Sequence, residues 1–224
     1  MTEKISFSEA LIEVRKAHRL LWNFYARLIP ACEQLMKEFE PATFYFSDYS
    51  SLGNRGNNPL LYSSMHYMLP FMRMDILYGH DRNREGWAHN PRKGDYLLVL
   101  SLQLDTAFSS EEAIVDNPGV SSDDFPSPEA TSTRIFLTTI YCNEDLDAKN
   151  WHARVYYGDW QYTPGKLMPY SLDGTEPTVD NAEFIAYGCE LDIEKELWSP
   201  DAIKRAAQRI RQDVNQHIPA INWP

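Results

Sequence analysis

The sequence predicts an α+β domain, in which a mainly antiparallel sheet of about six strands carries a long N-terminal and a C-terminal helix on one face. Three observations predict this fold class. The first forty residues repeat apolar side chains at helical spacing, the middle of the chain alternates with a period of two, and no helical segment of ten residues separates the later strand candidates. One domain of 224 residues is expected, with helical residues 1–40, a sheet with long loops over 43–192, and a helix over 199–218.

The N-terminal segment returns an apolar side chain every three or four residues, which places these side chains on one helix face. Ser6 and Glu9 fit a capping box, and Pro30 is expected to kink or divide the helix. Further apolar residues beside the stripe favour packing of the helix across a sheet, with a two-stranded coiled coil as the alternative. The stripe consists of Phe7, Leu11, Val14, His18, Leu21, Tyr25, Leu28, Cys32, Leu35 and Phe39.

The period changes to two after residue 41, in short runs rich in aromatic and branched side chains that are typical of strands. The clearest run, 96–105, places alternate leucines on one face, while its other face turns polar at Ser101, Gln103 and Asp105. Because no crossover helices are available, neighbouring strands are expected to be antiparallel. The six predicted strands are 43–47, 72–78, 96–105, 135–141, 151–157 and 183–192.

The last element is predicted to be a second amphipathic helix. Ser199 suits the N-cap, Pro200 suits the first helical position, and Asp201 suits the positive end of the helix dipole. Its buried stripe is predicted to contain Ile203, Ala207, Ile210, Val214 and Ile218. Basic side chains are left for the outer face.

Acidic residues are concentrated in the middle of the chain. The formal net charge is −11, and residues 94–148 hold 11 acidic side chains against Arg134 alone. Such a field repels phosphate backbones, so general nucleic-acid binding is not expected. A protein partner with a basic surface is expected instead, and the basic residues elsewhere in the chain are compatible with a homodimer.

The sequence contains no secretory signal and no apolar stretch suited to a membrane span, so a soluble, cytoplasmic protein without membrane contact is predicted. Cys32, Cys142 and Cys189 are odd in number and far apart, which predicts reduced, buried and unreactive thiols. No phosphate-binding loop, dinucleotide fingerprint or zinc motif is present. No cofactor is therefore expected.

The first candidate binding site is a basic loop between two predicted strands, residues 79–94. Arginine side chains of this density can hold a carboxylate or a phosphate through paired hydrogen bonds. The alternative is a solvated hairpin loop whose arginines pair with acids further along the chain. The candidate residues are His80, Asp81, Arg82, Arg84, Trp87, His89 and Arg92.

A second candidate is an aromatic cluster in residues 151–162. Alternation along a strand would place Trp151 on one face and Arg154 with Tyr156 on the other. Trp, Tyr and Arg dominate the binding energy of many protein interfaces, although aromatic clusters also serve as ordinary core packing. These three residues are therefore candidates for a protein-binding face.

The third candidate is a set of aspartates at strand positions, Asp75, Asp95 and Asp105. Carboxylates that converge at a sheet edge can bind a divalent metal ion and activate water. Aspartates are also common at strand ends and hairpin starts for structural reasons. Convergence in the folded chain would distinguish the two interpretations.

Two functions remain open from the sequence. A non-enzymatic binding or accessory protein, which engages a partner through an acidic and aromatic surface, is favoured by the absence of catalytic motifs. A metal-dependent hydrolase or nuclease-like enzyme that uses the three aspartates is the alternative.

Overall fold

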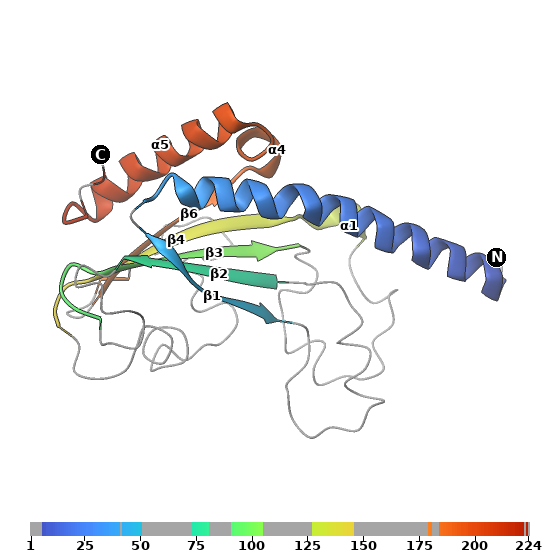
Figure 1. Ribbon diagram of the computed structural model, residues 1–224, viewed down its shortest axis with the longest axis horizontal. Coiled ribbons are helices and arrows are strands. Elements are labelled where there is room, and N and C mark those ends of the chain that lie inside the picture. Colours follow the sequence, from blue (N-terminus) through green and yellow to red (C-terminus); the bar gives the residue numbers. More distant parts are fainter. Residues whose placement is uncertain are drawn as a thin grey trace, which may run out of the picture.

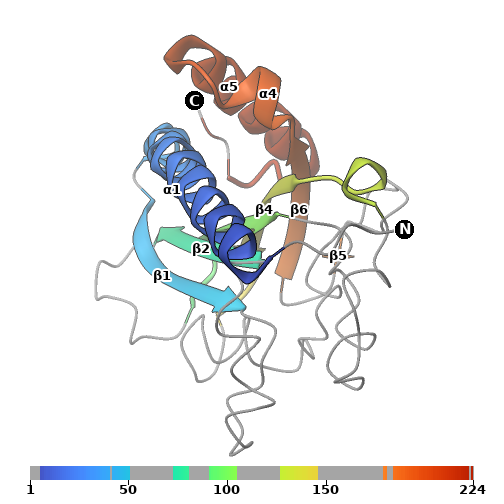
Figure 2. The same ribbon diagram turned by 90° about the vertical axis from the view of Figure 1, so that its right-hand side faces the viewer.

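A computed structural model describes residues 6–40, 42–50, 73–80, 91–104, 127–145, 179–180, 184–221 and 223 of the chain. Two long helices, α1 (Phe7–Lys37) and α5 (Pro200–His217), cover the same face of an antiparallel sheet (Figure 1, Figure 2). A short helix, α4 (Ile193–Glu196), and a single 3-10 turn, η3 (Pro128–Ala130), complete the helical elements among the described residues. The predicted α+β class, antiparallel sheet and two terminal helices are confirmed.

The sheet has the strand order β1-β2-β3-β4-β6-β5, and all neighbours are antiparallel. Its strands are β1 (Thr43–Ser50), β2 (Arg73–His80), β3 (Tyr96–Gln103), β4 (Arg134–Cys142), β5 (Val179–Asp180) and β6 (Phe184–Leu191). Only the four strands β2, β3, β4 and β6 pair in one unbroken register over eight residues or more.

The expectation of about six comparable strands is too high. β1 joins the four regular strands through a bulge between Phe44 and Phe46, and β5 contributes only two residues. The predicted strand over 151–157 lies outside the described residues. Alternating side chains reveal that a run can form a strand, but they do not reveal how far it pairs with a neighbour, because pairing depends on contacts remote in sequence.

Helix α1 begins at the predicted capping box. The Glu9 backbone N–H donates to the Ser6 hydroxyl at 3.3 Å, and the Ser6 backbone N–H donates to the Glu9 carboxylate at 2.9 Å. The side-chain hydrogen bond from Ser6 lowers the pKa of Glu9. Pro30 does not divide the helix, which runs without interruption from Phe7 to Lys37. The loss of one backbone bond is small beside the burial of Leu28 and Cys32 on either side of it.

The main core lies between the helices and the first face of the sheet. The second half of α1 contributes Leu28, Cys32, Leu35 and Met36, all at most 1% exposed. They meet alternate leucines of β3, odd-numbered residues of β4 and β6, and the predicted stripe of α5. Close to the chain end, the Trp223 ring lies 5.1 Å from the Phe39 ring.

The first half of α1 is not part of this core, so the expectation that the whole stripe packs on the sheet is wrong. Every residue from Ser6 to Leu20 is exposed, and full burial begins only at Leu28. The physical reason is length. Thirty-one helical residues span about 46 Å, whereas strands of eight or nine residues span roughly 27–31 Å. Figure 1 shows α1 continuing past the end of the sheet.

None of the described helices has the length and the apolar composition that a bilayer span requires. In α1 the apolar residues alternate with charged ones such as Glu9, Glu13, Arg15 and Lys16. The exposed half of this helix is therefore amphipathic.

The second face of the sheet is buried as well. Leu77, Leu97 and Ile140 are at most 1% exposed on this face, which the two helices do not cover. Toward one end the same face becomes polar at Ser101, as the alternation in the sequence predicts. Both faces of the sheet therefore hold buried side chains.

We predict different costs for two leucine substitutions on the same helix stripe. Leu35→Ala removes a side chain that is 0% exposed, so it should lower the free energy of unfolding by about 2–5 kcal/mol. Leu11→Ala removes a side chain that is 41% exposed, so its effect should stay within about 0.5 kcal/mol. Urea unfolding followed by circular dichroism measures both. Equal costs would mean that the described burial of α1 is wrong.

Candidate functional site

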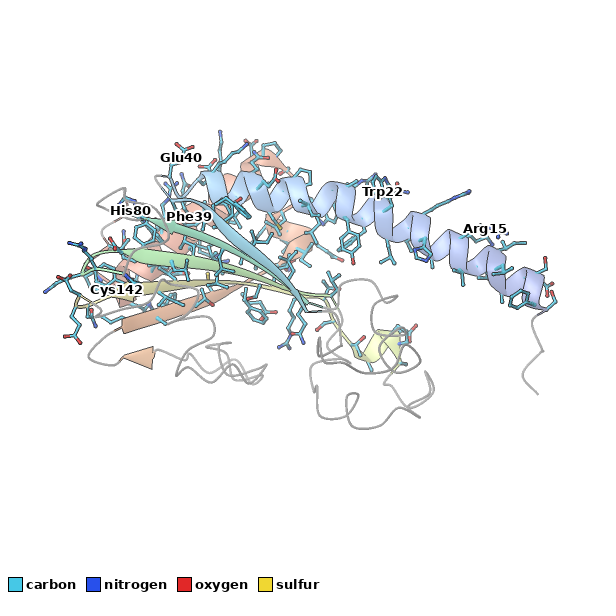
Figure 3. All side chains as sticks on the ribbon, turned by 60° about the horizontal axis from the view of Figure 1, so that its bottom comes forward. Arg15, Trp22, Phe39, Glu40, His80 and Cys142 are labelled. Atoms are coloured by element: carbon cyan, nitrogen blue, oxygen red, sulfur yellow. The ribbon has the colours of Figure 1, made fainter. Side chains whose placement is uncertain are left out.

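Six large apolar side chains are exposed on the first half of α1, residues Phe7–Trp22, which we call the α1 overhang. Figure 3 shows that this half, which carries the labelled Arg15 and Trp22, extends away from the sheet. The side chains and their exposed fractions are Phe7 80%, Leu11 41%, Ile12 42%, Val14 52%, Leu20 71% and Trp22 75%. Among the described residues, only Phe44 and Trp198 are other large hydrophobic side chains with comparable exposure.

The apolar stripe on the overhang is comparable with the largest patches on protein surfaces. With about 200 Å² for a large apolar side chain, Phe7, Leu11, Val14 and Trp22, which share one side of the helix, leave on the order of 500 Å² exposed. The largest apolar patch on a typical monomer is roughly 300–600 Å² and often functional. A standard protein interface buries about 800 Å² on each partner. The stripe of the overhang therefore lies within the range of apolar patches that often have a function.

The exposed side chains continue the stripe that packs in the core. Phe7, Leu11, Val14, His18 and Leu21 follow the alternating four- and three-residue spacing that leads on to the buried Leu28. Trp22 lies beside this stripe, whereas Ile12 and Leu20 lie toward the other side of the helix. The same helix face thus packs on the sheet along one half and is exposed along the other.

The overhang is held as a helix by local interactions. Lys16 donates to Glu13 at 2.8 Å, and both side chains are more than 60% exposed. An exposed pair of this kind contributes only about 0.2–0.5 kcal/mol. Local pairs and the capping box support helix formation, but they do not cover the apolar stripe.

A cavity of about 980 Å³ opens where α1 leaves the sheet. Phe24 of α1 and Trp198, which follows α4, provide its aromatic walls. The remaining lining combines four carboxylates with two cations and is completed by Thr133, Glu190, Leu191, Asp192, Ile193, Glu194, Lys195, Glu196 and Arg209. The cavity is net acidic.

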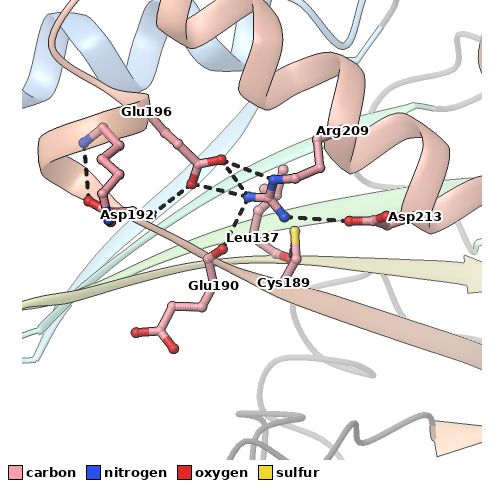
Figure 4. A network of polar contacts seen from close by, with 8 residues as sticks. Leu137, Cys189, Glu190, Asp192, Glu196, Arg209 and Asp213 are labelled. Atoms are coloured by element: carbon pink, nitrogen blue, oxygen red, sulfur yellow. Dashed lines mark hydrogen bonds and ion pairs between the residues drawn. The ribbon is translucent and has the colours of Figure 1, made fainter.

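Arg209 joins α5 to the turn between β6 and α4 (Figure 4). Its Nε donates to Glu196 Oε1 at 3.0 Å, and its Nη2 donates to Glu196 Oε2 at 3.1 Å. Nη2 also donates to the Glu190 carbonyl at 3.2 Å, and Nη1 donates to Asp213 at 3.4 Å. These contacts fully engage the guanidinium, so Arg209 serves as a structural clamp at the cavity wall.

Two acids of the cavity are engaged nearby. Asp192 accepts a hydrogen bond from the Lys195 ammonium at 2.5 Å and from the Lys195 backbone N–H at 3.1 Å, and these bonds lower the pKa of Asp192. Glu190 lies 3.7 Å from Arg134 with a side chain that is half exposed. The lowered pKa keeps Asp192 charged at neutral pH, which favours cationic groups in the cavity.

Most of the predicted basic loop falls outside the described residues, namely Asp81, Arg82, Arg84, Trp87 and His89. His80 ends β2, and its ring lies 5.0 Å from the Tyr96 ring. Arg92 is exposed, and its backbone N–H donates to the Asp95 carboxylate at 2.8 Å. The described part of this segment therefore forms a turn that leads into β3.

Trp151, Arg154 and Tyr156 of the predicted aromatic face lie outside the described residues, as does Asp105. The expectations for these residues stay predictions.

The structure does not bring Asp75 and Asp95 together. Asp75 pairs with Ser101 in the β2–β3 ladder. Ser101 lies six residues after Asp95 along the extended chain, so the backbone positions of Asp75 and Asp95 are roughly 20 Å apart. Asp95 is 2% exposed and holds the turn before β3 through its bond to Arg92, next to Gly94 at a φ of 94°. Among the described side chains, no group of three His, Cys, Asp or Glu could hold a metal ion.

The three cysteines are free thiols and all are buried. Burial raises the pKa of Cys32 to about 12 and that of Cys189 to about 12. The Cys189 thiol also donates to the Leu137 carbonyl at 3.7 Å. The Cys32 and Cys189 thiols are therefore protonated at neutral pH and are not suited to act as nucleophiles.

Sequence reasoning identified the apolar stripe of α1 but assigned all of it to the core. Its length was the signal that could have corrected this, because a helix of about forty residues is longer than any strand of ten residues or fewer. The cavity beside α4 had no sequence signal. Phe24, Glu190 and Arg209 are far apart in the chain, and only the fold brings them together.

Comparison with known families gives a match over most of the chain. The family model PM0109 matches residues 4–219, which is nearly the whole chain. No curated protein and no solved structure matches the chain.

The Arg209 clamp predicts a measurable stability difference. Arg209→Ala should lower the free energy of unfolding by about 1–2 kcal/mol, because it removes charge-assisted bonds from a side chain that is 39% exposed and partly screened by water. Lys204→Ala on the exposed face of α5 is the matched control and should change stability little. Equal effects of the two substitutions in urea melts would contradict a clamp.

Thiol reactivity provides a second prediction. In the folded protein at pH 8 a thiol reagent should label none of the three cysteines, and in denaturant it should label all three. The pKa of an unfolded thiol is about 8.5. In the folded protein, burial raises the pKa of Cys32 and of Cys189 to about 12. Their contribution to stability is therefore complete below about pH 8.5 and is lost as the pH rises above it. Rapid labelling of the native chain would refute this prediction.

Proposed function

This chain belongs to the PM0109 family, and we propose that it is a non-enzymatic binding or accessory protein whose α1 overhang docks against a protein partner. The exposed apolar stripe of the overhang is the observation that carries this proposal. Exposed apolar area of this size stabilises association, since its removal from water contributes about 25 cal/mol for each Å² before the entropic costs of binding. The helix is already formed, so a partner need not order it.

The proposed partner presents an apolar ridge to the stripe and basic side chains beside it. Phe7 and Trp22 are the natural anchors, because large aromatic side chains provide much of the energy of protein interfaces. The acidic cavity next to Phe24 lies at the base of the overhang and suits a lysine or arginine of the partner. The net charge of −11 favours the approach of a basic surface. A cytoplasmic location agrees with this proposal and stays a prediction.

The metal-dependent hydrolase built on Asp75, Asp95 and Asp105 has less support. Asp75 and Asp95 are too far apart along the β2–β3 ladder to bind the same metal ion. Asp95 also has a structural role in the turn before β3. Binding through the overhang therefore remains the preferred function.

We predict that the double substitution Leu11→Glu with Val14→Glu abolishes partner binding and leaves the fold intact. Both side chains are exposed in the free protein, so their replacement should change the unfolding transition little, whereas two carboxylates in an apolar interface are costly. Asn23→Glu, which adds a carboxylate at another exposed position of α1, is the matched control. The measurement is cross-linking capture from the source cell with each variant, followed by binding kinetics of the purified partner.

A partner retained by the wild type and by Asn23→Glu, lost by the double variant, and slower to associate at high salt would support the proposal. The same proteins recovered with all three variants would overturn it. Sedimentation of the purified chain tests a second copy as the occupant. If the wild type is a dimer and the double variant is a monomer, the overhang is a docking surface for a second copy of this chain. That result would overturn the proposal of a separate basic partner.

A further inference from the structure

The cavity where α1 leaves the sheet has an apolar floor. Leu191, at the end of β6, is 2% exposed, and Phe24 and Ile193 are partly buried and pack against the main core. The volume of about 980 Å³ falls within the range of about 300–1,000 Å³ that is typical of small-molecule sites. The floor is therefore suited to the apolar part of a ligand.

Trp198 is an exposed aromatic side chain on a fixed backbone. It lines the cavity and is 45% exposed. The preceding residue, Leu197, is buried and donates its backbone N–H to the Ile193 carbonyl at 3.3 Å. The following residue, Ser199, caps α5 by accepting a hydrogen bond from the Ala202 backbone N–H at 3.2 Å. The indole is thus held at the cavity and remains open to a ligand, and Trp is the aromatic side chain that attracts cations most strongly.

Each cation that lines the cavity is already engaged by a carboxylate. Arg209 donates two hydrogen bonds to Glu196, and the Lys195 ammonium donates one to Asp192. Within each of these pairs the two charges neutralise each other.

Glu194 adds a negative charge beyond these pairs. It lies in the first turn of α4, is exposed and lines the cavity. The Glu190 carboxylate, in contrast, points away from Arg209 (Figure 4). Thr133 donates its hydroxyl to the Leu104 carbonyl at 2.8 Å, so its oxygen can still accept a hydrogen bond. The cavity therefore offers acceptors and one surplus negative charge to a cationic donor.

We propose that this cavity is a binding site for an alkylammonium group, that is, a primary ammonium on an aliphatic stem. The stem packs on the apolar floor, and the ammonium meets the Trp198 ring and the Glu194 carboxylate. A lysine of the docking partner and a free diamine are two sources of this group. The first source rests on the proposed function, whereas the site itself does not depend on the α1 overhang.

The test titrates the purified full-length chain with n-butylammonium chloride at constant ionic strength and follows the backbone amide signals of residues 191–198 by NMR. The wild type should show saturable shifts. 1-Butanol, which has the same stem without the charge, should give none. Glu194→Gln and Trp198→Ala should each bind the ammonium about tenfold more weakly, because each removes a group that contacts the charge. Both side chains are exposed, so the fold should tolerate these changes.

Two matched controls should bind like the wild type. Glu144→Gln removes an exposed carboxylate at the end of β4 opposite Thr133. Phe44→Ala removes an exposed aromatic ring on β1, which β2, β3 and β4 separate from β6. No saturable shift with n-butylammonium, equal binding of 1-butanol, or undiminished binding by Glu194→Gln would overturn the site.

A titration with 1,5-diaminopentane distinguishes the two sources. Clearly tighter binding than that of n-butylammonium would identify a free diamine as the ligand, and equal binding would identify a lysine side chain; both results support the site. The double variant Leu11→Glu with Val14→Glu should bind n-butylammonium like the wild type, because neither residue lines the cavity. A chain that captures a partner but binds no alkylammonium would overturn the cavity site and leave docking by the overhang in place.

Discussion

The difference in length between α1 and the strands governs the surface of this protein. A helix of about 46 Å lies on strands of roughly 27–31 Å, so the sheet can bury only part of its apolar stripe. The second half of the helix closes the core with Leu28, Cys32 and Leu35, and the first half remains exposed with Phe7 and Trp22. One continuous sequence pattern thus supplies both the main core and the proposed docking surface.

The α4 turn lies close to the place where α1 leaves the sheet. Arg209 ties α5 to Glu196 and to the carbonyl of Glu190, which keeps the end of β6 beside α5. The acidic cavity at this junction combines a rigid frame with carboxylates that water still reaches. Apolar and electrostatic features therefore meet at the base of the overhang, where a partner can use both.

The two faces of the sheet have different chemistry. The face under the helices is apolar and closes the larger core, whereas the opposite face changes from Leu97 and Ile140 at one end to Ser101 and Gln103 at the other. Buried polar side chains such as these cost free energy unless a hydrogen-bond partner satisfies them. The docking proposal concerns the other layer, which holds α1.

The sequence by itself determined the elements, because capping, helical spacing and alternation are local: Ser6 and Ser199 cap the helices as predicted, and the strands of the regular sheet fall where alternation predicts them. The register of Asp75 with Asp48 and Ser101, and its distance from Asp95, were decided only by the tertiary structure. The tertiary structure also decided which half of the α1 stripe is buried. Local patterns indicate which face of an element is apolar. Which strands pair, and how much of an apolar face is buried, depend on contacts between residues that are far apart in the chain.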